Sequence, residues 1–149
     1  MIQRKVLIVV ILALCMTACG GHKRQLPLIP LKMTVDISTD PAVNNGEVFW
    51  MVVREVDADQ FSRDTYEEIE SNVLANEWGP DVLNVCAVVP GGTHKITIPK
   101  PMYRPAAFYF LFSWQQDYWK VLLPQPVKSK CRLHIEQHRA YIEPLKGTW

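Results

Sequence analysis

Two cysteines and two histidines are the side chains of this sequence best suited to binding a metal ion. Cys131, His134 and His138 are spaced by three and four residues, and Cys86 lies upstream as a fourth donor. Two thiolates and two imidazoles are a tetrahedral ligand set for Zn²⁺. The segment around Cys131 reads as a strand, however, and side chains three positions apart on a strand point to opposite faces. Because a zinc site needs converging ligands, we predict that no metal is bound here.

The motifs of several common enzyme classes do not occur in the sequence. There is no G-x-S-x-G nucleophile elbow, no phosphate-binding glycine-rich loop and no H-E-x-x-H zinc motif. Cys86 lies in an apolar run without an adjacent base that would activate it. The acidic pair Glu67-Glu68 is typical of a solvated helix face. We therefore predict a protein without catalytic activity, cofactor or small-molecule substrate.

Cys19 has the sequence context of another chemistry, the covalent attachment of lipid. Arg4 and Lys5 precede an unbroken apolar run over residues 6–16. The run is about half of the ~20 residues needed to span a bilayer, which favours a secretory signal peptide. Its end, Met16-Thr17-Ala18-Cys19, resembles the bacterial lipobox, in which two small residues precede a cysteine that is diacylated. An ordinary signal peptide that happens to contain a cysteine is the alternative.

Lipidation at Cys19 would divide the chain into three parts. Residues 1–18 would be a lipoprotein signal peptide, residues 19–30 an acylated tether, and residues 31–149 the folded domain. Two or more acyl chains make anchoring stable, because each buried CH₂ contributes about 0.8 kcal/mol. Gly20 rather than Asp follows the cysteine, which by resemblance to sorted lipoproteins favours the outer membrane. We therefore expect a domain that faces the periplasm and is attached to outer-membrane lipid through Cys19.

The composition is typical of one globular domain and excludes a basic nucleic-acid-binding module. The chain has 149 residues, of which 48% are hydrophobic and 21% are charged. Sixteen Lys and Arg residues against fifteen Asp and Glu residues give a net charge of +1. No field of one sign would therefore attract DNA or RNA.

Cys86 and Cys131 remain once the signal peptide and Cys19 are set aside. The periplasm is an oxidising compartment, so a disulfide between them is one interpretation. It would close a loop of about 45 residues and stabilise the domain by ~3–4 kcal/mol. Two small buried thiols are the alternative, and both remain open because the sequence gives no Cα distance.

The hydrophobic pattern predicts a mainly β fold, a β-sandwich of about seven or eight strands with a short helical insertion after the second strand. The run at residues 48–53 lacks alternation, which predicts a strand covered on both faces. The aromatics Phe108-Tyr109-Phe110 and Trp114 are expected to pack in the core. The expected strands are residues 31–37, 48–53, 82–89, 95–98, 106–112, 118–123, 131–135 and 140–142.

The helical insertion is expected within residues 57–76. Apolar residues recur there at helical spacing and should pack onto the sandwich as one stripe, while polar residues near the start offer caps. The stripe is Phe61, Tyr66, Ile69 and Val73, and the candidate caps are Asp57, Asp59, Ser62 and Asp64.

An acylated amino terminus, a short tether and a sandwich with a helical insertion occur together in one known family. Here a hydrophobic strand ends in Arg54, the insertion contains Phe61, and a Pro90-Gly91 turn precedes an alternating strand. Ala107-Phe108 then precedes Trp119-Lys120-Val121. In this order the features resemble the type VI secretion system outer-membrane lipoprotein family, TssJ/SciN. The resemblance implies a transthyretin-like β-sandwich with a structural role and no catalytic activity.

The resemblance also implies a partner and a binding loop. Proteins of that family anchor an envelope-spanning complex and bind the periplasmic domain of the inner-membrane protein TssM through the loop between the first two strands. We expect this loop to be fixed in shape, because Asn and Gly tolerate positive φ, and exposed, with Val43 as the one residue that can contact the core. A plain hairpin connection is the alternative. The loop consists of Thr39, Asp40, Pro41, Ala42, Val43, Asn44, Asn45 and Gly46.

Two other functions make different structural demands. A pilotin-like lipoprotein, which guides a secretin to the outer membrane, would need a long exposed apolar groove for a helical tail. A small periplasmic binding or inhibitor lipoprotein would need a deep pocket or a protruding polar loop.

Overall fold

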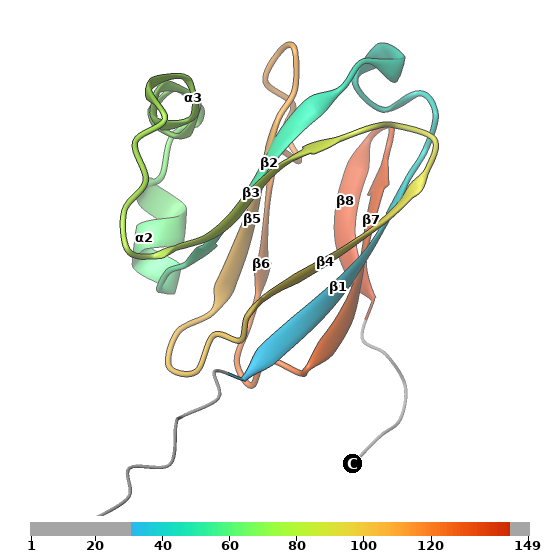
Figure 1. Ribbon diagram of the computed structural model, residues 1–149. Helices are drawn as coiled ribbons and strands as arrows, with labels where there is room; N and C mark the ends of the chain where they lie inside the picture. The colour runs from blue at the N-terminus through green and yellow to red at the C-terminus, as the bar shows by residue number, and fades with distance from the viewer. Residues whose placement is uncertain (1–30, 144–149) are drawn as a thin grey trace, which may run out of the picture.

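The computed structural model describes residues 31–143, so the predicted signal peptide, the tether and Cys19 lie outside the described residues. The described part contains eight strands, a short 3-10 segment and two helices (Figure 1). Their bounds are β1 Lys32–Thr39, η1 Val43–Gly46, β2 Phe49–Glu55, α2 Ala58–Arg63, α3 Tyr66–Ala75, β3 Val82–Val88, β4 Thr93–Pro99, β5 Ala106–Leu111, β6 Lys120–Leu123, β7 Lys130–Glu136 and β8 Arg139–Glu143.

The strands form two four-stranded sheets that pack face to face. One sheet has the order β4-β1-β7-β8 and the other the order β3-β2-β5-β6. Neighbouring strands are antiparallel, except that β1 and β7 run parallel with Val35 opposite Cys131. The predicted β-sandwich with a helical insertion after the second strand is therefore confirmed.

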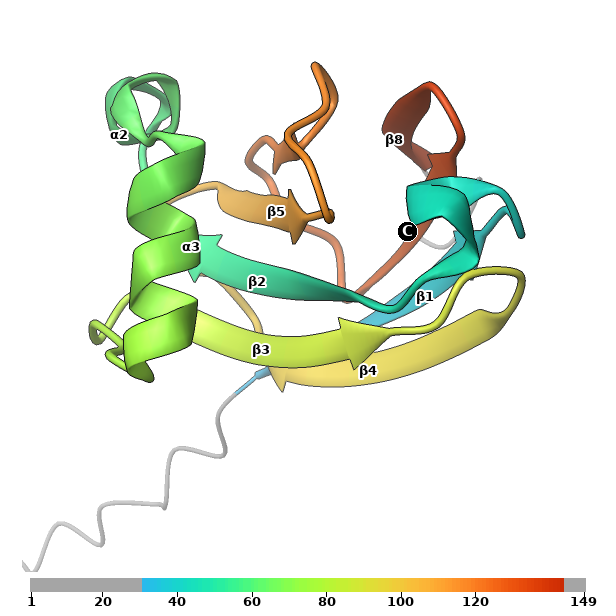
Figure 2. The ribbon, with the colours of Figure 1, turned by 90° about the horizontal axis from the view of Figure 1, so that it is seen from above.

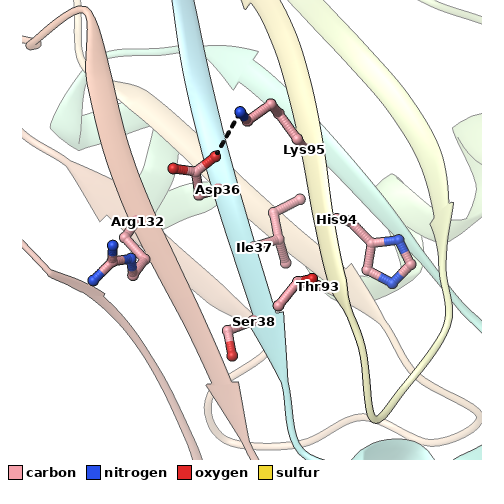
Figure 3. A pocket seen from close by; sticks show the side chains of 7 residues that line it. All are labelled: Asp36, Ile37, Ser38, Thr93, His94, Lys95 and Arg132. Atoms are coloured by element: carbon pink, nitrogen blue, oxygen red, sulfur yellow. Dashed lines mark ion pairs between the residues drawn. The ribbon is translucent and has the colours of Figure 1, made fainter.

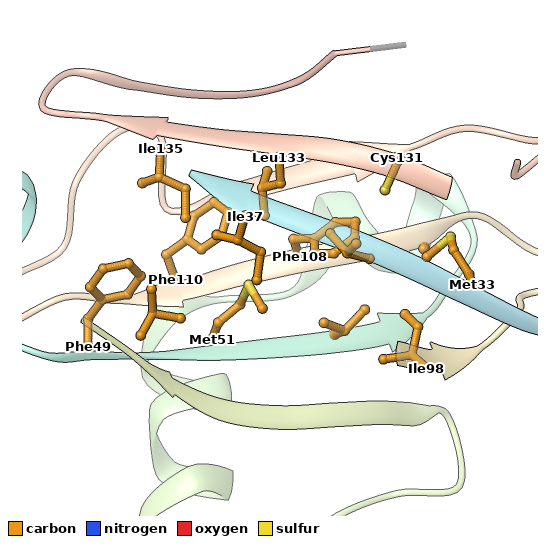
Figure 4. Close-up of a cluster of buried hydrophobic side chains, with 14 of the residues drawn as sticks. Met33, Ile37, Phe49, Met51, Ile98, Phe108, Phe110, Cys131, Leu133 and Ile135 are labelled. Atoms are coloured by element: carbon orange, nitrogen blue, oxygen red, sulfur yellow. The ribbon is translucent and has the colours of Figure 1, made fainter. Parts of the chain in front are cut away.

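Alternate side chains of both sheets fill the space between them (Figure 4). The apolar residues of β1 point inward, as their spacing of two predicts for a strand with one wet face. β5 is buried along its whole length, because one face meets the other sheet and the second face meets the helices. The largest buried side chains include Met33, Ile37, Phe49, Met51, Ile98, Phe108, Tyr109, Phe110, Leu133 and Ile135.

The helices α2 and α3 cover the outer face of the β3-β2-β5-β6 sheet (Figure 2). Asp57 accepts a hydrogen bond from the backbone N–H of Gln60 at 2.7 Å and caps α2. The Thr65 hydroxyl accepts one from the Glu68 backbone N–H at 3.3 Å and caps α3. The prediction of Asp57 as a cap is confirmed. None of the described helices is long and apolar enough to cross a membrane.

The predicted apolar stripe holds the insertion on the sheet. Tyr66 and Ile69 are buried against β2 and β5, and Phe61 and Val73 are partly buried beside them. The Tyr66 hydroxyl also donates a hydrogen bond to the backbone carbonyl of Phe112, and burial raises the pKa of Tyr66 to about 12. This side chain therefore stays neutral and acts as a donor at any physiological pH.

Replacing Ile69 tests how firmly the insertion is held. Ile69 is 2% exposed, so Ile69→Ala should lower the free energy of unfolding by about 2–4 kcal/mol through lost burial and a new cavity. Urea unfolding measures the change. The exposed Ser71 on the same helix gives a matched control, because Ser71→Ala should shift stability by no more than about 0.5 kcal/mol. An unchanged unfolding midpoint for Ile69→Ala would mean that the helices are loosely attached.

Two sequence expectations about exposed aromatic and apolar residues are wrong. The segment 48–53 is not covered on both faces, because Val48 and Trp50 are about half exposed. The helices cover the sheet from Val52 onward, so the outer face of the strand is open to solvent at its first residues. Trp114 does not pack in the core either, since it lies exposed in the loop between β5 and β6.

Candidate partner-binding loop

The loop between β1 and β2 lies at the end of the sandwich opposite to the start of β1 (Figure 1). It leaves β1 at Thr39, passes through η1 and enters β2 at Phe49. The turn between β3 and β4 and the loop between β5 and β6 lie at the same end. The predicted binding loop is therefore one part of a cluster of loops.

Three consecutive residues of this loop have left-handed backbone conformations. Asn44 has φ 50°, Asn45 has φ 55° and Gly46 has φ 80°. Such values disfavour most side chains, whereas Asn and Gly tolerate them. The predicted corner with positive φ is confirmed.

The Asn44 side chain fixes the shape of this corner. Its amide nitrogen donates to the backbone carbonyls of Glu47 at 3.1 Å and Val48 at 3.3 Å. Its carbonyl oxygen accepts from the backbone N–H of Ser113 at 2.7 Å. The Ser113 hydroxyl in turn donates to a Glu47 carboxylate oxygen at 2.8 Å. A single side chain thus ties the loop to the β5–β6 loop.

The first half of the loop is tied to the β3–β4 turn. The backbone N–H groups of Thr39 and Asp40 donate to the carbonyls of Gly92 and Ile135 at 3.1 and 3.0 Å. The Thr39 hydroxyl lies 3.3 Å from the backbone N–H and the carbonyl of Gly92. Gly91 has φ 77°, and a Cβ there would lie 3.4 Å from Pro41. The loop therefore packs closely on its neighbour and keeps one shape.

Burial corrects which residues of the loop can meet a partner. Thr39 is 6% exposed and Asn44 is 7%, so the expectation of an exposed loop is wrong for these two, whereas Val43, which is 0% exposed, makes the core contact that the sequence left open for it. Val43 joins the core between the sheets, while Thr39 and Asn44 form the internal hydrogen bonds just described. Asp40, Pro41, Ala42, Asn45 and Gly46 are exposed. The part of the loop available for binding is therefore these five residues.

Two exposed apolar side chains beside the loop were missed by the sequence interpretation. Val89 lies before the β3–β4 turn and is joined to the loop by a hydrogen bond from the Thr39 hydroxyl to its carbonyl at 3.3 Å. Trp114 follows Ser113, which Asn44 binds. A tryptophan within the polar segment Ser113–Asp117 was the available signal for an exposed aromatic.

The densest group of charged side chains lies elsewhere, beneath the helices. Asp64, whose side chain is 0% exposed, pairs with Arg54 at 3.1 Å and accepts hydrogen bonds from Gln60 and the Tyr109 hydroxyl. Arg54 also pairs with Asp81 at 2.7 Å. Burial and the hydrogen bond to Asp64 raise the pKa of Tyr109, so its hydroxyl stays a donor. Every one of these groups is satisfied, which indicates a structural role.

Lys120 completes this network from β6. Its ammonium group donates to the backbone carbonyls of Phe61 at 2.6 Å and Asp64 at 2.9 Å, where α2 ends. The same group lies over the rings of Phe61 and Trp119 at 4.8 and 4.9 Å. Burial lowers the pKa of Lys120. The contacts fasten the link between the two helices to the sheet.

Cys86 and Cys131 are free thiols in the structure, so the disulfide left open from the sequence is not formed in it. Cys86 lies on the edge strand β3, and Cys131 on an inner strand of the other sheet. The two thiols therefore lie on strands of opposite sheets and are not bonded to each other. Burial raises the pKa of Cys86 and raises that of Cys131 to about 11, which keeps both thiols protonated.

Cys131 and His134 lie on opposite faces of β7, as predicted from their spacing. Cys131 is in the core, whereas the His134 ring lies on the outer face, stacked on Tyr141 at 5.0 Å. Within residues 31–143 no three His, Cys, Asp or Glu side chains are grouped so as to hold a metal ion.

The outer face of the β4-β1-β7-β8 sheet carries a hollow of about 310 Å³ (Figure 3). Asp36 lies in it and forms ion pairs with Lys95 at 3.8 Å and Lys130 at 3.1 Å, so its charge is already compensated. The hollow lies on an open sheet face instead of between the two layers, unlike the enclosed clefts that bind small molecules. Its lining residues are Asp36, Ile37, Ser38, Thr93, His94, Lys95 and Arg132.

Solved structures share this fold over most of the chain. The type VI secretion lipoprotein TssJ1 from Pseudomonas aeruginosa aligns with a TM-score of 0.59 and 17% identity, over 80% of this chain and 99% of that one. Serratia marcescens Lip, a membrane-bound component of the type VI secretion system, aligns with a TM-score of 0.61 and 13% identity, over 80% of this chain and 100% of that one. A structure described as the T6SS protein TssM C-terminal domain (869-1107) from EAEC aligns with a TM-score of 0.56 and 16% identity, over 74% of this chain and 99% of that one. The predicted resemblance in fold is confirmed.

A model of a sequence family also matches this chain. A comparison with curated proteins found no match. The family model described as IglE, N-terminal domain, matches residues 50–136, from β2 to the end of β7 and more than half of the chain. The chain therefore belongs to the IglE N-terminal domain family.

Proposed function

We propose that this chain is a structural lipoprotein of a type VI secretion membrane complex, anchored in the outer membrane through acylated Cys19. In this proposal it binds the periplasmic domain of the inner-membrane protein TssM through the β1–β2 loop. The support is the fold shared with lipoproteins of that system, the lipobox-like sequence before Cys19, and a structure of a TssM domain among the matches.

The direction of β1 is the observation that carries the proposal. Residue 31 directly follows the segment predicted to be the tether, and β1 runs from there to the loop at the other end (Figure 1). Its eight residues span about 26 Å at 3.3 Å per residue. A lipid anchor at one end thus leaves the loop at the far end free to meet a partner that crosses the periplasm.

The loop has the properties of a pre-organised contact. Its hydrogen bonds to two neighbouring loops hold Asp40, Ala42 and Asn45 in one arrangement, so little conformational entropy would be lost on docking. Val89 and Trp114 beside it supply apolar area, and Trp is enriched among residues that dominate binding energy.

A bulky charge on the loop should weaken this binding. Ala42 is exposed, so Ala42→Arg combined with Asp40→Ala should weaken binding to the TssM periplasmic domain at least about tenfold without altering the fold. Titration calorimetry measures the affinity, and circular dichroism checks the fold. Val43 and Asn44 are left unchanged because they hold the loop together.

Ser71→Arg combined with Asp59→Ala is the matched control for this experiment, because it changes the net charge by the same two units at exposed positions. Ser71 is exposed on α3, so the variant adds the same side chain to another surface and should bind as the wild type does. Wild-type affinity in the loop variant would contradict the assignment of the loop. Equal loss in both variants would show that the effect is one of charge alone.

A pilotin-like function finds little support in the surface. The apolar groove between α3 and the start of β2 is lined by Trp50, Val73 and Leu74 and has a volume of about 180 Å³. A docked helix uses anchors over at least two turns, at positions i, i+3 or i+4, and i+7. A groove of this size holds roughly one or two large side chains, less than such a helix requires.

A further inference from the structure

The end of the sandwich at which β1 begins carries three large exposed side chains. Tyr103 is 89% exposed, Leu31 is 57% and Met102 is 55%. The Lys100 backbone N–H donates to the Leu31 carbonyl at 2.8 Å, so the β4–β5 loop that carries Met102 and Tyr103 begins beside Leu31. Single exposed apolar residues are common on protein surfaces, but a group of them usually marks a binding surface.

Basic side chains surround this group. Lys32, Lys100 and Arg104 form no ion pair within residues 31–143. The carboxylates of Glu55 and Asp57 accept backbone hydrogen bonds, from Tyr103 and Arg104 and from Gln60 respectively, and keep their charge, but within the described residues neither forms an ion pair with these three cations. The positive charge at this end is therefore available to an anionic partner.

The loop that presents Tyr103 is fixed in place. A Glu55 carboxylate oxygen accepts from the Arg104 backbone N–H at 3.2 Å, and the Gln125 side-chain amide donates to the Arg104 carbonyl at 2.6 Å. The Val56 backbone N–H donates to the Pro105 carbonyl at 3.1 Å. The aromatic ring thus projects from a rigid loop with almost no contact to the rest of the protein.

We propose that this end, formed by Leu31, Lys32, Lys100, Met102, Tyr103 and Arg104, is a membrane-docking surface for a bilayer that contains anionic phospholipid. The inference rests on the proposed anchoring at Cys19. Eleven residues, 20–30, separate the acylated Cys19 from Leu31, and the twelve steps between these two Cα atoms can span at most about 40 Å. The tether therefore ends within this surface and keeps it close to the bilayer.

The chemistry of the surface matches the membrane interface. Tyr is enriched at the boundary between headgroups and acyl chains, where its ring is apolar and its hydroxyl is wet. Lys and Arg side chains reach from there to anionic headgroups, and Leu31 and Met102 supply the apolar area. Docking in this way orients β1 away from the membrane, so the β1–β2 loop points toward the periplasm.

Vesicle flotation tests the surface without the acyl chains. Both hydrophobic clusters lie within residues 31–143, so a chain of residues 19–149 with Cys19→Ser keeps the whole fold. It should float with vesicles of phosphatidylglycerol and phosphatidylethanolamine, and far less with phosphatidylcholine vesicles. Binding should fall at about 1 M salt, where the Debye length is about 3 Å.

Two variants separate the charged and apolar contributions. Lys32→Gln with Arg104→Gln should weaken partitioning about thirtyfold, since each cation near an anionic surface contributes about fivefold. Tyr103→Ser should weaken it with little change in salt dependence. Lys95→Gln with Arg139→Gln removes two exposed cations of other elements and should leave partitioning unchanged.

The outcomes distinguish this surface from the lipid anchor. Failure of the Cys19→Ser chain to float with anionic vesicles, or equal loss in the Lys95 and Arg139 control, would overturn the docking surface. Neither result concerns acylation, because no acyl chain is present. The anchoring itself is read from the membrane fractionation of the full chain.

Discussion

Asp64→Ala should lower the free energy of unfolding by about 3–5 kcal/mol, one of the largest effects expected of any single substitution in this domain. The Asp64 side chain is completely buried and binds Arg54 at 3.1 Å, Gln60 at 2.6 Å and the Tyr109 hydroxyl. Its removal leaves the largely buried Arg54 guanidinium with Asp81 alone and leaves the buried Tyr109 hydroxyl without its acceptor. Unpaired buried groups cost far more than the net gain of a satisfied pair.

Two further variants make this prediction specific. Asp59 lies exposed on α2, so Asp59→Ala should change stability by no more than about 0.5 kcal/mol. Asp64→Asn keeps the size of the side chain and one acceptor but loses the charge, so its effect should fall between the other two. Urea unfolding gives all three values. A loss of under about 1 kcal/mol for Asp64→Ala would mean that water reaches and solvates Arg54.

The alternation of apolar and polar residues was enough to predict most strands of the fold. Met33, Val35 and Ile37 alternate with polar residues and all point into the core, because neighbouring side chains of a strand face opposite ways. The helical stripe through Tyr66 and Ile69 was likewise readable, since positions three and four apart share a helix face. These features depend on local spacing, which the sequence displays directly.

Contacts between segments far apart in the sequence could not be predicted from local spacing. Asp64 reads as a candidate helix cap, but its partner Tyr109 lies 45 positions away, and their contact makes Asp64 a buried acceptor. Asn44 reads as a turn residue, and only the approach of Ser113, 69 positions away, shows why its side chain is buried. The parallel pairing of β1 with β7 has the same origin. Pairing across a sheet is decided by the whole packed structure and leaves no local pattern.

In the candidate binding loop, too, local features could be predicted from the sequence and tertiary contacts could not. Positive φ at Asn44, Asn45 and Gly46 followed from residue type, and the structure confirms it. The orientation of Val43 stayed open, because an apolar residue in a turn can point either way. The structure places Val43 in the core between the sheets, while Pro41 of the same loop packs against Gly91 of the β3–β4 turn.

Cys19→Ser should release the protein from the membrane fraction or leave it unprocessed. The thioether to diacylglycerol requires a sulfur atom, so serine removes the only proposed attachment chemistry. Residues 19–30 then join the domain to no lipid, and the docking surface around Tyr103 by itself binds lipid only reversibly, so a wash with about 1 M salt during fractionation removes the protein. Fractionation of cells followed by immunoblotting measures the shift, and mass spectrometry of the wild-type protein measures the added acyl mass.

Cys15 provides the matched control, since it lies four residues earlier within the predicted signal peptide. Cys15→Ser should leave both processing and membrane attachment unchanged, because residue 15 would be removed with the signal. An ordinary signal peptide makes a different prediction: both variants would be cleaved and both would be soluble, as would the wild type. If Cys19→Ser still fractionates with the outer membrane while Cys15→Ser behaves as the wild type, attachment does not depend on the thiol, and the anchor must be sought in another part of the chain.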